Sequence, residues 1–249
     1  MSTDGERQDL VWQGDDLVRT FVNDVRGGVP YGADQIEIML RVVAARRAPL
    51  WRFADLGCGS GVLARALLAR FPGAEAVLVD FSEPMLATAR RELGDRIPPV
   101  AFVSADLAAP AWVDAVRAYT PFDVIVSGYA IHHLSDERKR ALYGEVYALL
   151  APGGLFLNIE HVASATPWVA AIADELMIDS IWAFQQERGS GKTLEQVAKE
   201  FVYRPDKAAN ILAPVADQCA WLRDIGFDDV DCYFKACELA VFGGRKPVG

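Results

Sequence analysis

The chain has 249 residues, 52% of them hydrophobic, and a formal net charge of −9 at pH 7. This length fits one large α/β domain, or one with an insertion, and the apolar content is ample for its core. The negative charge argues against a nucleic acid as main partner, because such proteins usually present a basic face. No apolar run approaches 18 residues, and the polar start MSTDGERQDL has no signal-peptide core, so we expect neither a membrane span nor export.

The first 47 residues carry apolar side chains at helical spacing from residue 9 onward, interrupted by a glycine-rich stretch at 27–32. This pattern predicts two helices joined by an elbow. Two interpretations stay open for it. The segment is either a packing extension of the domain or a lid whose elbow, with Tyr31, closes over a ligand.

Residues 51–61, WRFADLGCGSG, form the stretch around which the chain is organised. A short apolar run contains the acid Asp55, glycines follow at every second position, and a helix-like run begins at 62. This order predicts a strand, a tight turn and a helix start, where glycines allow positive φ and close approach of a ligand. Cys58 is interpreted as a small space-filler in that turn. The four cysteines show no metal-binding spacing, which favours reduced thiols in a cytoplasmic protein.

Strand and helix patterns then alternate as far as residue 159, which predicts right-handed crossovers and an open parallel sheet. The predicted strands are 50–56, 76–80, 100–104, 123–127 and 154–159, with helices at 61–71, 83–93, 110–119 and 136–150. After residue 160 we expect a mostly helical block at 167–212, a helix at 215–224 and strands at 230–234 and 238–242. The expected fold class is α/β: a Rossmann-like, seven-stranded, mostly parallel sheet with helices on both faces.

We expect a single domain that has four parts. These are an N-terminal helical lid (1–48), a ligand-binding core (49–161), a helical insertion after strand five (162–213) and a last helix with C-terminal strands (214–249). Ser82 and Ser135 are predicted helix N-caps. The run Arg138-Lys139-Arg140 is interpreted as a solvated helix face. The aromatic residues of the insertion could roof a site, but packing within the insertion is the favoured interpretation; they are Trp168, Trp182, Phe184, Phe201 and Tyr203.

Polar residues follow the predicted strands at the edge where parallel sheets bind ligands. Asp80 ends the second strand, where one carboxylate can accept both hydroxyls of a ribose. Asp106 follows the third strand, where it could read an adenine edge. Ser127 ends the fourth strand, and Glu160 with His161 ends the fifth. Each acid alone could be a helix cap or a turn residue, but the ordered series favours a nucleotide-like ligand.

These motifs together resemble class I S-adenosylmethionine-dependent methyltransferases over roughly residues 50–160. The matching stretches, in order, are Asp55-Leu-Gly-Cys-Gly-Ser-Gly61, Asp80, Ser104-Ala-Asp106, Phe122-Asp-Val-Ile-Val-Ser127, His132-His133-Leu134 and Pro152-Gly-Gly154. The acid two residues before the first glycine, and the GxGxG spacing, distinguish this pattern from that of nicotinamide enzymes. The resemblance implies S-adenosyl-L-methionine as cofactor and S-adenosyl-L-homocysteine as product.

The resemblance also implies roles for individual residues. Asp55 with Gly57, Gly59 and Gly61 would hold the methionine moiety, and Asp80 would take the ribose hydroxyls. Phe81 and Met85 would pack on the adenine, whose amino group Asp106 would bind. Further cofactor contacts are assigned to Tyr31, Cys58, Ala105, Leu107 and Ser127, and substrate contacts to Tyr129, Tyr203 and Arg204.

The flanking segments resemble a second group, the tRNA-uridine carboxy-S-adenosylmethionine synthases and their relatives. The similarity lies in Val29-Pro-Tyr-Gly32, in the helical insertion leading to Tyr203-Arg204, and in Ile225-Gly-Phe227. In those synthases an arginine of the insertion binds the extra carboxylate, and Arg204 is the nearest match. Ser60 departs from the synthase pattern, which has a leucine there.

Methyl transfer requires alignment and, for a protonated acceptor, a base. His133 and His161 are the base candidates, with Glu160 as a partner that could orient His161 or pair with a cationic acceptor. A packing or loop role remains open for both histidines, and His132 is interpreted as structural. No metal-binding spacing is present. The leading hypothesis is a small-molecule methyltransferase, which could be a homodimer. A carboxy-S-adenosylmethionine synthase-like or tRNA-modifying enzyme and a non-catalytic cofactor-binding protein remain alternatives.

Overall fold

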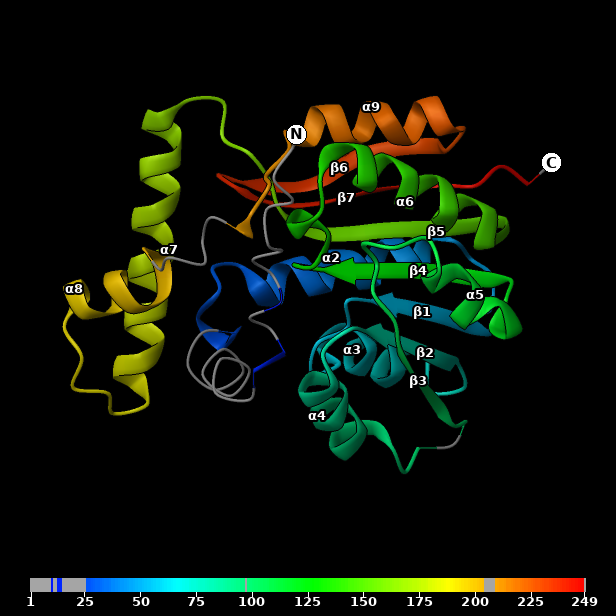
Figure 1. Cartoon of the computed structure of the whole chain (residues 1–249), viewed down its shortest axis with the longest axis horizontal. Coiled ribbons are helices and arrows are strands. Elements are labelled where there is room, and N and C mark those ends of the chain that lie inside the picture. Colours follow the sequence, from blue (N-terminus) through cyan, green and yellow to red (C-terminus); the bar gives the residue numbers. More distant parts are fainter. Residues whose placement is uncertain (1–9, 11–12, 15–25, 97, 204–208, 249) are drawn as a thin grey trace, which may run out of the picture.

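A seven-stranded sheet forms the centre of the molecule, with strand order β3-β2-β1-β4-β5-β7-β6 (Figure 1). This is a computed structural model, and it describes residues 10, 13–14, 26–96, 98–203 and 209–248. The strands are β1 Arg52–Leu56, β2 Glu75–Asp80, β3 Val100–Ser104, β4 Phe122–Gly128, β5 Leu150–His161, β6 Asp228–Ala236 and β7 Leu239–Arg245. The first five are parallel, and β7 runs antiparallel between β5 and β6.

Helices cover both faces of this sheet, as the alternating pattern predicts. The described helices are α2 Gly32–Ala45, α3 Val62–Arg70, α4 Glu83–Leu93, α5 Trp112–Val116, α6 Asp136–Leu149, α7 Pro167–Glu187, α8 Leu194–Val197 and α9 Val215–Ile225. Helices α5, α6 and α9 pack on one face, and α2, α3 and α4 on the other. Among them, no helix in the described part of the chain is both long and apolar enough to cross a bilayer.

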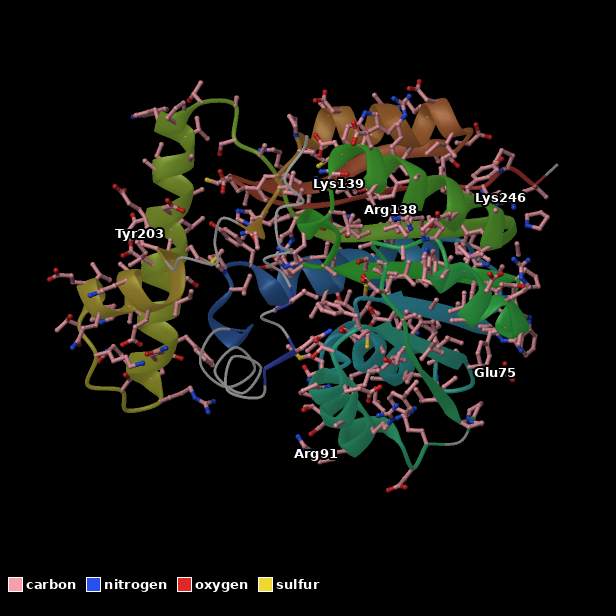
Figure 2. The ribbon with its side chains drawn as sticks, viewed as in Figure 1. Glu75, Arg91, Arg138, Lys139, Tyr203 and Lys246 are labelled. Carbon is pink, nitrogen blue, oxygen red and sulfur yellow. The ribbon has the colours of Figure 1, made fainter. Side chains whose placement is uncertain are left out.

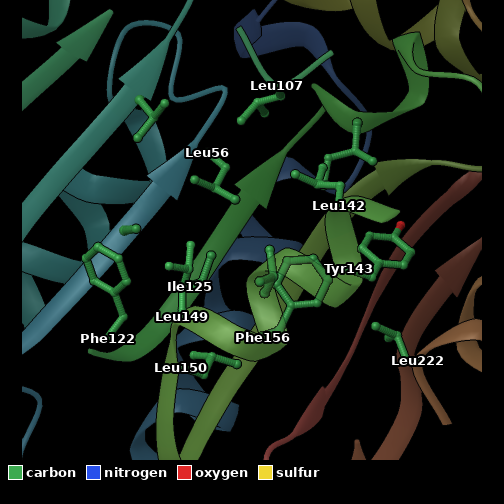
Figure 3. Close-up of a cluster of buried hydrophobic side chains, with 14 of the residues drawn as sticks. Leu56, Leu107, Phe122, Ile125, Leu142, Tyr143, Leu149, Leu150, Phe156 and Leu222 are labelled. Atoms are coloured by element: carbon green, nitrogen blue, oxygen red, sulfur yellow. The ribbon is translucent and has the colours of Figure 1, made fainter. Parts of the chain in front are cut away.

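The α5–α6–α9 face contains a continuous apolar core (Figure 3). Phe122 and Phe156 come from strands, Tyr143 from α6 and Leu222 from α9, and none of these four side chains is exposed to solvent. The strands are buried on both faces, which explains their near-continuous apolar sequences. This packing fixes the positions at which the strands end, and the polar residues that follow them lie at one edge.

Both predicted N-caps are confirmed. Ser82 accepts a hydrogen bond from the Met85 amide at the start of α4, and Ser135 accepts one from the Arg138 amide at the start of α6. A capping side chain satisfies an amide that has no partner within its helix. The two caps therefore fix where α4 and α6 begin, directly after the loops at the ends of β2 and β4.

The interpretation of Arg138-Lys139-Arg140 as a solvated face is wrong for two of its residues. Lys139 is 1% exposed, and its ammonium group bonds Asp136 and the carbonyl of Ile211. Arg138 forms a two-pronged ion pair with Glu145. Figure 2 shows both side chains labelled on α6. Asp136 and Glu145 lie on α6 itself, but Ile211 is distant in the sequence, so the charge run alone could not reveal the burial of Lys139.

The insertion stands beside the sheet, beyond the ends of the strands, where α7 and α8 pack together (Figure 1). A short helix at Arg26–Gly28 packs against α7, which brings the elbow to the insertion. A Cβ on Gly27 would lie 2.4 Å from the Phe184 ring, and one on Gly28 would lie 2.9 Å from the Ile181 Cα. Glycine is therefore needed at both positions for this close approach. The predicted helix before the elbow lies mostly outside the described residues.

Candidate active site

One pocket lies at the carboxyl ends of β1 to β5, between the sheet and α7. Its walls come from the glycine turn after β1, the ends of β2 and β3, the loop after β4, the end of β5, the β6–β7 turn, the elbow and the insertion. The elbow reaches the pocket through Val29 and Pro30. Both interpretations of the N-terminal segment, a packing extension and a lid, are compatible with this contact, and the lid role stays a prediction.

The glycine turn forms one side of the pocket. Gly57, Gly59 and Gly61 have φ of 62°, 53° and 79°, values that side-chain-bearing residues rarely adopt. A Cβ on Gly57 would lie 2.2 Å from the Ala130 Cβ. A Cβ on Gly59 would meet only the Met85 sulfur, at 3.8 Å, so it would occupy pocket space. The turn thus leaves an open, backbone-lined surface for a ligand.

Asp55 and Asp80 hold this turn in place and also line the pocket. Asp55 Oδ2 accepts from the Ala64 amide at the start of α3, at 3.1 Å. Asp80 accepts from the Gly59 amide through Oδ2 and from the Ser82 amide through Oδ1, both at 2.8 Å. Burial raises the pKa of Asp80 above its ordinary value, and the hydrogen bonds from the Ser82 and Gly59 amides oppose that rise.

Most of the other predicted cofactor residues also line this half of the pocket; they are Cys58, Phe81, Met85, Ala105, Asp106 and Leu107. Cys58 is buried. Its burial, and to a smaller extent the negative charges of Asp80 and Asp55, raise the pKa of its thiol well above the ordinary value. Such a thiol stays protonated, as expected of a space-filler. Asp106 accepts from the Ala108 amide at 2.9 Å.

Two predicted cofactor residues lie elsewhere. Ser127 is fully buried at the end of β4, and its hydroxyl donates to the Leu56 carbonyl at 2.8 Å. Tyr31 is 46% exposed and packs its ring against Phe234, with centroids 5.9 Å apart. The structure therefore places Ser127 within the sheet and Tyr31 at the surface beside the elbow. Their cofactor roles stay predictions.

The opposite half of the pocket contains His132, His133 and His161, which are all the histidines of the chain. The His132 Nδ1 lies 2.6 Å from Glu160 Oε1, and the His161 Nε2 lies 2.8 Å from Glu238 Oε2. The His133 Nδ1 lies 3.3 Å from the Ala209 carbonyl. Among the described residues, no cluster of three or more His, Cys, Asp or Glu side chains has the arrangement of a metal site.

Glu160 does not orient the ring of His161, contrary to one interpretation of the sequence. It is 1% exposed; Oε1 accepts from the His161 backbone amide at 2.7 Å, and its side chain pairs with His132. Burial by itself would raise the pKa of Glu160, but His132 and the His161 amide hold that pKa below its ordinary value. The partner of the His161 ring is Glu238, in the turn between β6 and β7.

Of the predicted substrate residues that the structure describes, Tyr129 lines the pocket and Tyr203 does not. The Tyr129 hydroxyl donates to Gln35 Oε1 of α2 at 2.6 Å. Tyr203 is 58% exposed on the α7–α8 side of the molecule, as Figure 2 shows. Arg204 lies outside the described residues.

The roof of the pocket is aliphatic rather than aromatic. The α7 residues Leu176, Met177 and Ile181 line it, together with Val202. Trp168 and Trp182 are 75% and 37% exposed, and Phe184 packs against Gly27 of the elbow. The side chain of Phe201 is outside the described part of the chain. The favoured interpretation, that these aromatic residues form the insertion's own core, is therefore wrong for Trp168 and Tyr203.

The polar residues of this half that sequence reasoning missed are Asp174, Asn210 and Glu238. Asp174 and Asn210 lie in the insertion, where no strand pattern indicates which side chains face the sheet. Glu238 lies in a turn beside Cys237, whose φ is 49°. The sequence predicted Glu238 as the first residue of a strand at 238–242, so no signal marked it as a pocket residue.

Comparisons with known proteins agree with this geometry. The model of a methyltransferase domain matches residues 53–154. A carboxy-S-adenosyl-L-methionine synthase of Aeromonas hydrophila is 30% identical over 227 residues, which cover 88% of this chain and 84% of the synthase. A demethylmenaquinone methyltransferase of Thermus thermophilus is 39% identical over 118 residues, 47% of this chain and 50% of that enzyme.

A solved structure shares the fold at low sequence identity. Human N-acetylserotonin methyltransferase, in complex with S-adenosylmethionine, superposes with a TM-score of 0.62 and 16% identity, covering 99% of this chain and 60% of that one. The chain thus spans half the length of the Thermus relative and less than two thirds of the human protein.

Proposed function

The chain belongs to the family of S-adenosylmethionine-dependent methyltransferases, and we propose that it methylates a small-molecule acceptor. The observation that carries this proposal is the pocket itself, in which a glycine turn and strand-end acids face three histidines. When bound, S-adenosylmethionine supplies an activated methyl group on its sulfonium sulfur.

The residues of the glycine half fit this cofactor. The backbone around Gly59 leaves space that a side chain would fill, and Asp80 places a carboxylate beside it. Phe81 and Met85 offer an apolar surface for a purine, next to Asp106. Asp80 would hold the ribose hydroxyls, and the turn would hold the methionine portion.

The histidine half would hold the acceptor under the aliphatic roof formed by Leu176, Met177, Ile181 and Val202. Closure of α7 and the elbow over this space would exclude water and align the acceptor. This enclosed position supports a small molecule over a nucleic acid, in line with the net charge of −9.

A carboxy-S-adenosylmethionine synthase-like activity is the second candidate, favoured by the match over 84% of the Aeromonas enzyme. Its distinguishing residue would be Arg204, which lies outside the described residues. The mass of the ligand that copurifies with the protein separates the two candidates. A carboxylated cofactor would replace the first proposal with the second.

We also propose a cytoplasmic setting and a homodimer. The four free cysteines support a reducing compartment. The exposed Trp168, Ile172 and Trp182 of α7 support a self-association surface. Sedimentation velocity tests the dimer: a monomer at micromolar concentration would contradict it.

Titration calorimetry with S-adenosylmethionine tests the cofactor assignment, and transfer of a labelled methyl group to a panel of phenols, alcohols, amines and carboxylates tests the activity. Gly59→Val should abolish binding, because its side chain would fill pocket space and φ of 53° disfavours valine. Unchanged affinity in this variant would contradict the assignment. Binding without transfer to any member of the panel would favour a non-catalytic role.

A further inference from the structure

Two of the three histidines in the pocket are each paired with a carboxylate, and the two pairs differ in their surroundings. The rings of His132 and His161 meet edge to face, with centroids 5.8 Å apart. The pairs are therefore neighbours in one polar cluster. Which of them faces an acceptor depends on what each carboxylate contacts.

In the His132–Glu160 pair only His132 lines the pocket, and the buried carboxylate of Glu160 holds the backbone. Glu160 accepts from the His132 ring, from the His132 amide at 3.1 Å and from the His161 amide at 2.7 Å, and the Asn158 amide group lies 3.4 Å from it. These contacts tie the loop after β4 to the end of β5. A carboxylate with this many protein partners acts as a structural connector.

The His161–Glu238 pair faces the pocket, because both residues line it. Their side chains are 17% and 10% exposed. The antiparallel pairing of β5 with β7 sets His161 opposite Leu239, and the Val162 amide donates to the Glu238 carbonyl at 2.7 Å. The end of β5 and the β6–β7 turn therefore hold this histidine and its carboxylate together.

We infer that Glu238 is the positioning residue for His161 as general base, and that the acceptor atom of this enzyme carries a proton, as a hydroxyl or an amine does. The inference deepens the proposed methyl transfer and rests on it. An ionised Glu238 accepts from Nε2 of His161, so the neutral ring carries its proton there. Its Nδ1 then has the free lone pair.

Methyl transfer in this pocket moves the acceptor proton to His161. The O–H or N–H bond of the acceptor breaks and its proton passes to Nδ1 of His161, while the acceptor electron pair forms the bond to the methyl carbon and the carbon–sulfur pair stays on sulfur. His161 becomes an imidazolium, which the Glu238 carboxylate stabilises. The proton then leaves to solvent, which restores the neutral ring.

This arrangement specifies a substrate class. A carboxylate oxygen carries no proton at neutral pH and needs no base to be methylated. A neutral phenol or alcohol, or an amine, gains from a base held by a carboxylate. We therefore expect the acceptor to belong to this class.

The first test reads the proton position without any acceptor. Long-range proton–nitrogen NMR spectra of protein labelled in histidine contain signals from three rings, which the variants His132→Gln, His133→Gln and His161→Gln assign. With S-adenosylhomocysteine present, at alkaline pH where the rings are neutral, His161 should show the Nε2–H form. Glu238→Gln should convert it to a mixture of both forms, because glutamine can donate or accept.

Glu160→Gln is the matched comparison for this spectrum, because it alters the partner of His132 and leaves Glu238 in place. The exposed Glu92→Gln, whose partner is Arg65, controls for the substitution itself. An Nδ1–H form of His161 in the wild type, or a form unchanged in Glu238→Gln, would overturn the positioning role.

The second test uses the acceptor panel. Phenols, alcohols or amines should be methylated, and their carboxylate analogues should react at least tenfold more slowly. Glu238→Gln should lower kcat about 100-fold while KM changes less than about threefold. Glu238→Asp, which keeps a carboxylate, should lower kcat less than Glu238→Gln does. A carboxylate as the best acceptor, or an unchanged kcat, would overturn the inference.

Calorimetry with S-adenosylhomocysteine distinguishes a wrong inference about Glu238 from a wrong proposal of methyltransferase function. Intact affinity with an unaltered kcat in Glu238→Gln refutes the role of Glu238 alone. Absence of cofactor binding in the wild type refutes the methyltransferase proposal, whatever the NMR spectra show.

Discussion

The two halves of the pocket are built in different ways. The glycine half consists of turns that directly follow parallel strands, and its key contacts join residues close in sequence or on adjacent strands, such as Asp80 with Gly59 and Ser82. The histidine half joins the loop after β4, the end of β5, α7 and the β6–β7 turn. A shared cofactor can be held by the first kind of structure, whereas acceptor choice can vary through the second.

Substitution in the glycine turn should produce the largest effect. It should impair cofactor binding in the glycine half and leave the histidine half unchanged. In Gly57→Ala the new Cβ would lie 2.2 Å from the Ala130 Cβ, at a φ of 62°. The clash and the strain together should weaken S-adenosylhomocysteine binding by about 3 kcal/mol, roughly 100-fold in calorimetry.

Gly73→Ala is the control for this substitution, because no atom lies within 4 Å of its Cβ. Its binding should match the wild type. Equal affinities for the Gly57 and Gly73 variants would show that the turn does not form the cofactor surface.

Glu160→Gln, in the histidine half, should mainly lower the free energy of unfolding. Loss of the buried pair with His132 should cost about 3 kcal/mol of unfolding free energy at pH 7, measured by urea denaturation. The folded state holds the pKa of Glu160 below its ordinary value of 4.5, so this stability is present above that pH and disappears as pH falls through the folded pKa. The difference between wild type and variant should therefore narrow below pH 4.5. A constant difference down to acid pH would rule out this origin.

Asp80→Ala tests the acid that serves both the turn and the cofactor. Removal of a charged hydrogen-bond acceptor should weaken S-adenosylhomocysteine binding by roughly 1.5–3 kcal/mol in calorimetry. The exposed Asp95→Ala is the matched control. Equal binding by both variants would remove the ribose-binding role from Asp80.

Tyr129→Phe should produce the smallest effect. It removes a hydrogen bond that connects the loop after β4 to α2. Its hydroxyl donates to the buried Gln35, at 2.6 Å, and the loss should cost about 1 kcal/mol of unfolding free energy. Tyr233→Phe, which removes an exposed bond to the Asp229 carbonyl, should cost less in the same urea denaturation. The reverse order would show that the Tyr129 contact does not stabilise the loop.

The same contrast explains what the sequence could predict. The sheet and the glycine half follow from local patterns: apolar runs, the glycines at 57, 59 and 61, and acids at strand ends. The boundaries of β3 agree, at Val100–Ser104 as predicted, whereas β5 begins at Leu150, before its predicted start at 154. Such features depend on residues near one another in the chain.

The histidine half depends on distant contacts and was predicted only in part. Glu238 is 77 residues from His161 and meets it because β7 runs antiparallel beside β5. The sequence indicated a strand at 238–242, which gave no reason to place this acid in a turn at the pocket. Lys139 is similar: its burial follows from the Ile211 carbonyl, in a segment packed on the histidine loop.

A crystal structure with S-adenosylhomocysteine tests the central claim most directly. We expect the methionine portion along Gly57–Gly61, the ribose hydroxyls on Asp80, and the sulfur pointing toward the histidine half that contains His161 and Glu238. Ligand density in any other place, or a sulfur directed away from these histidines, would contradict it.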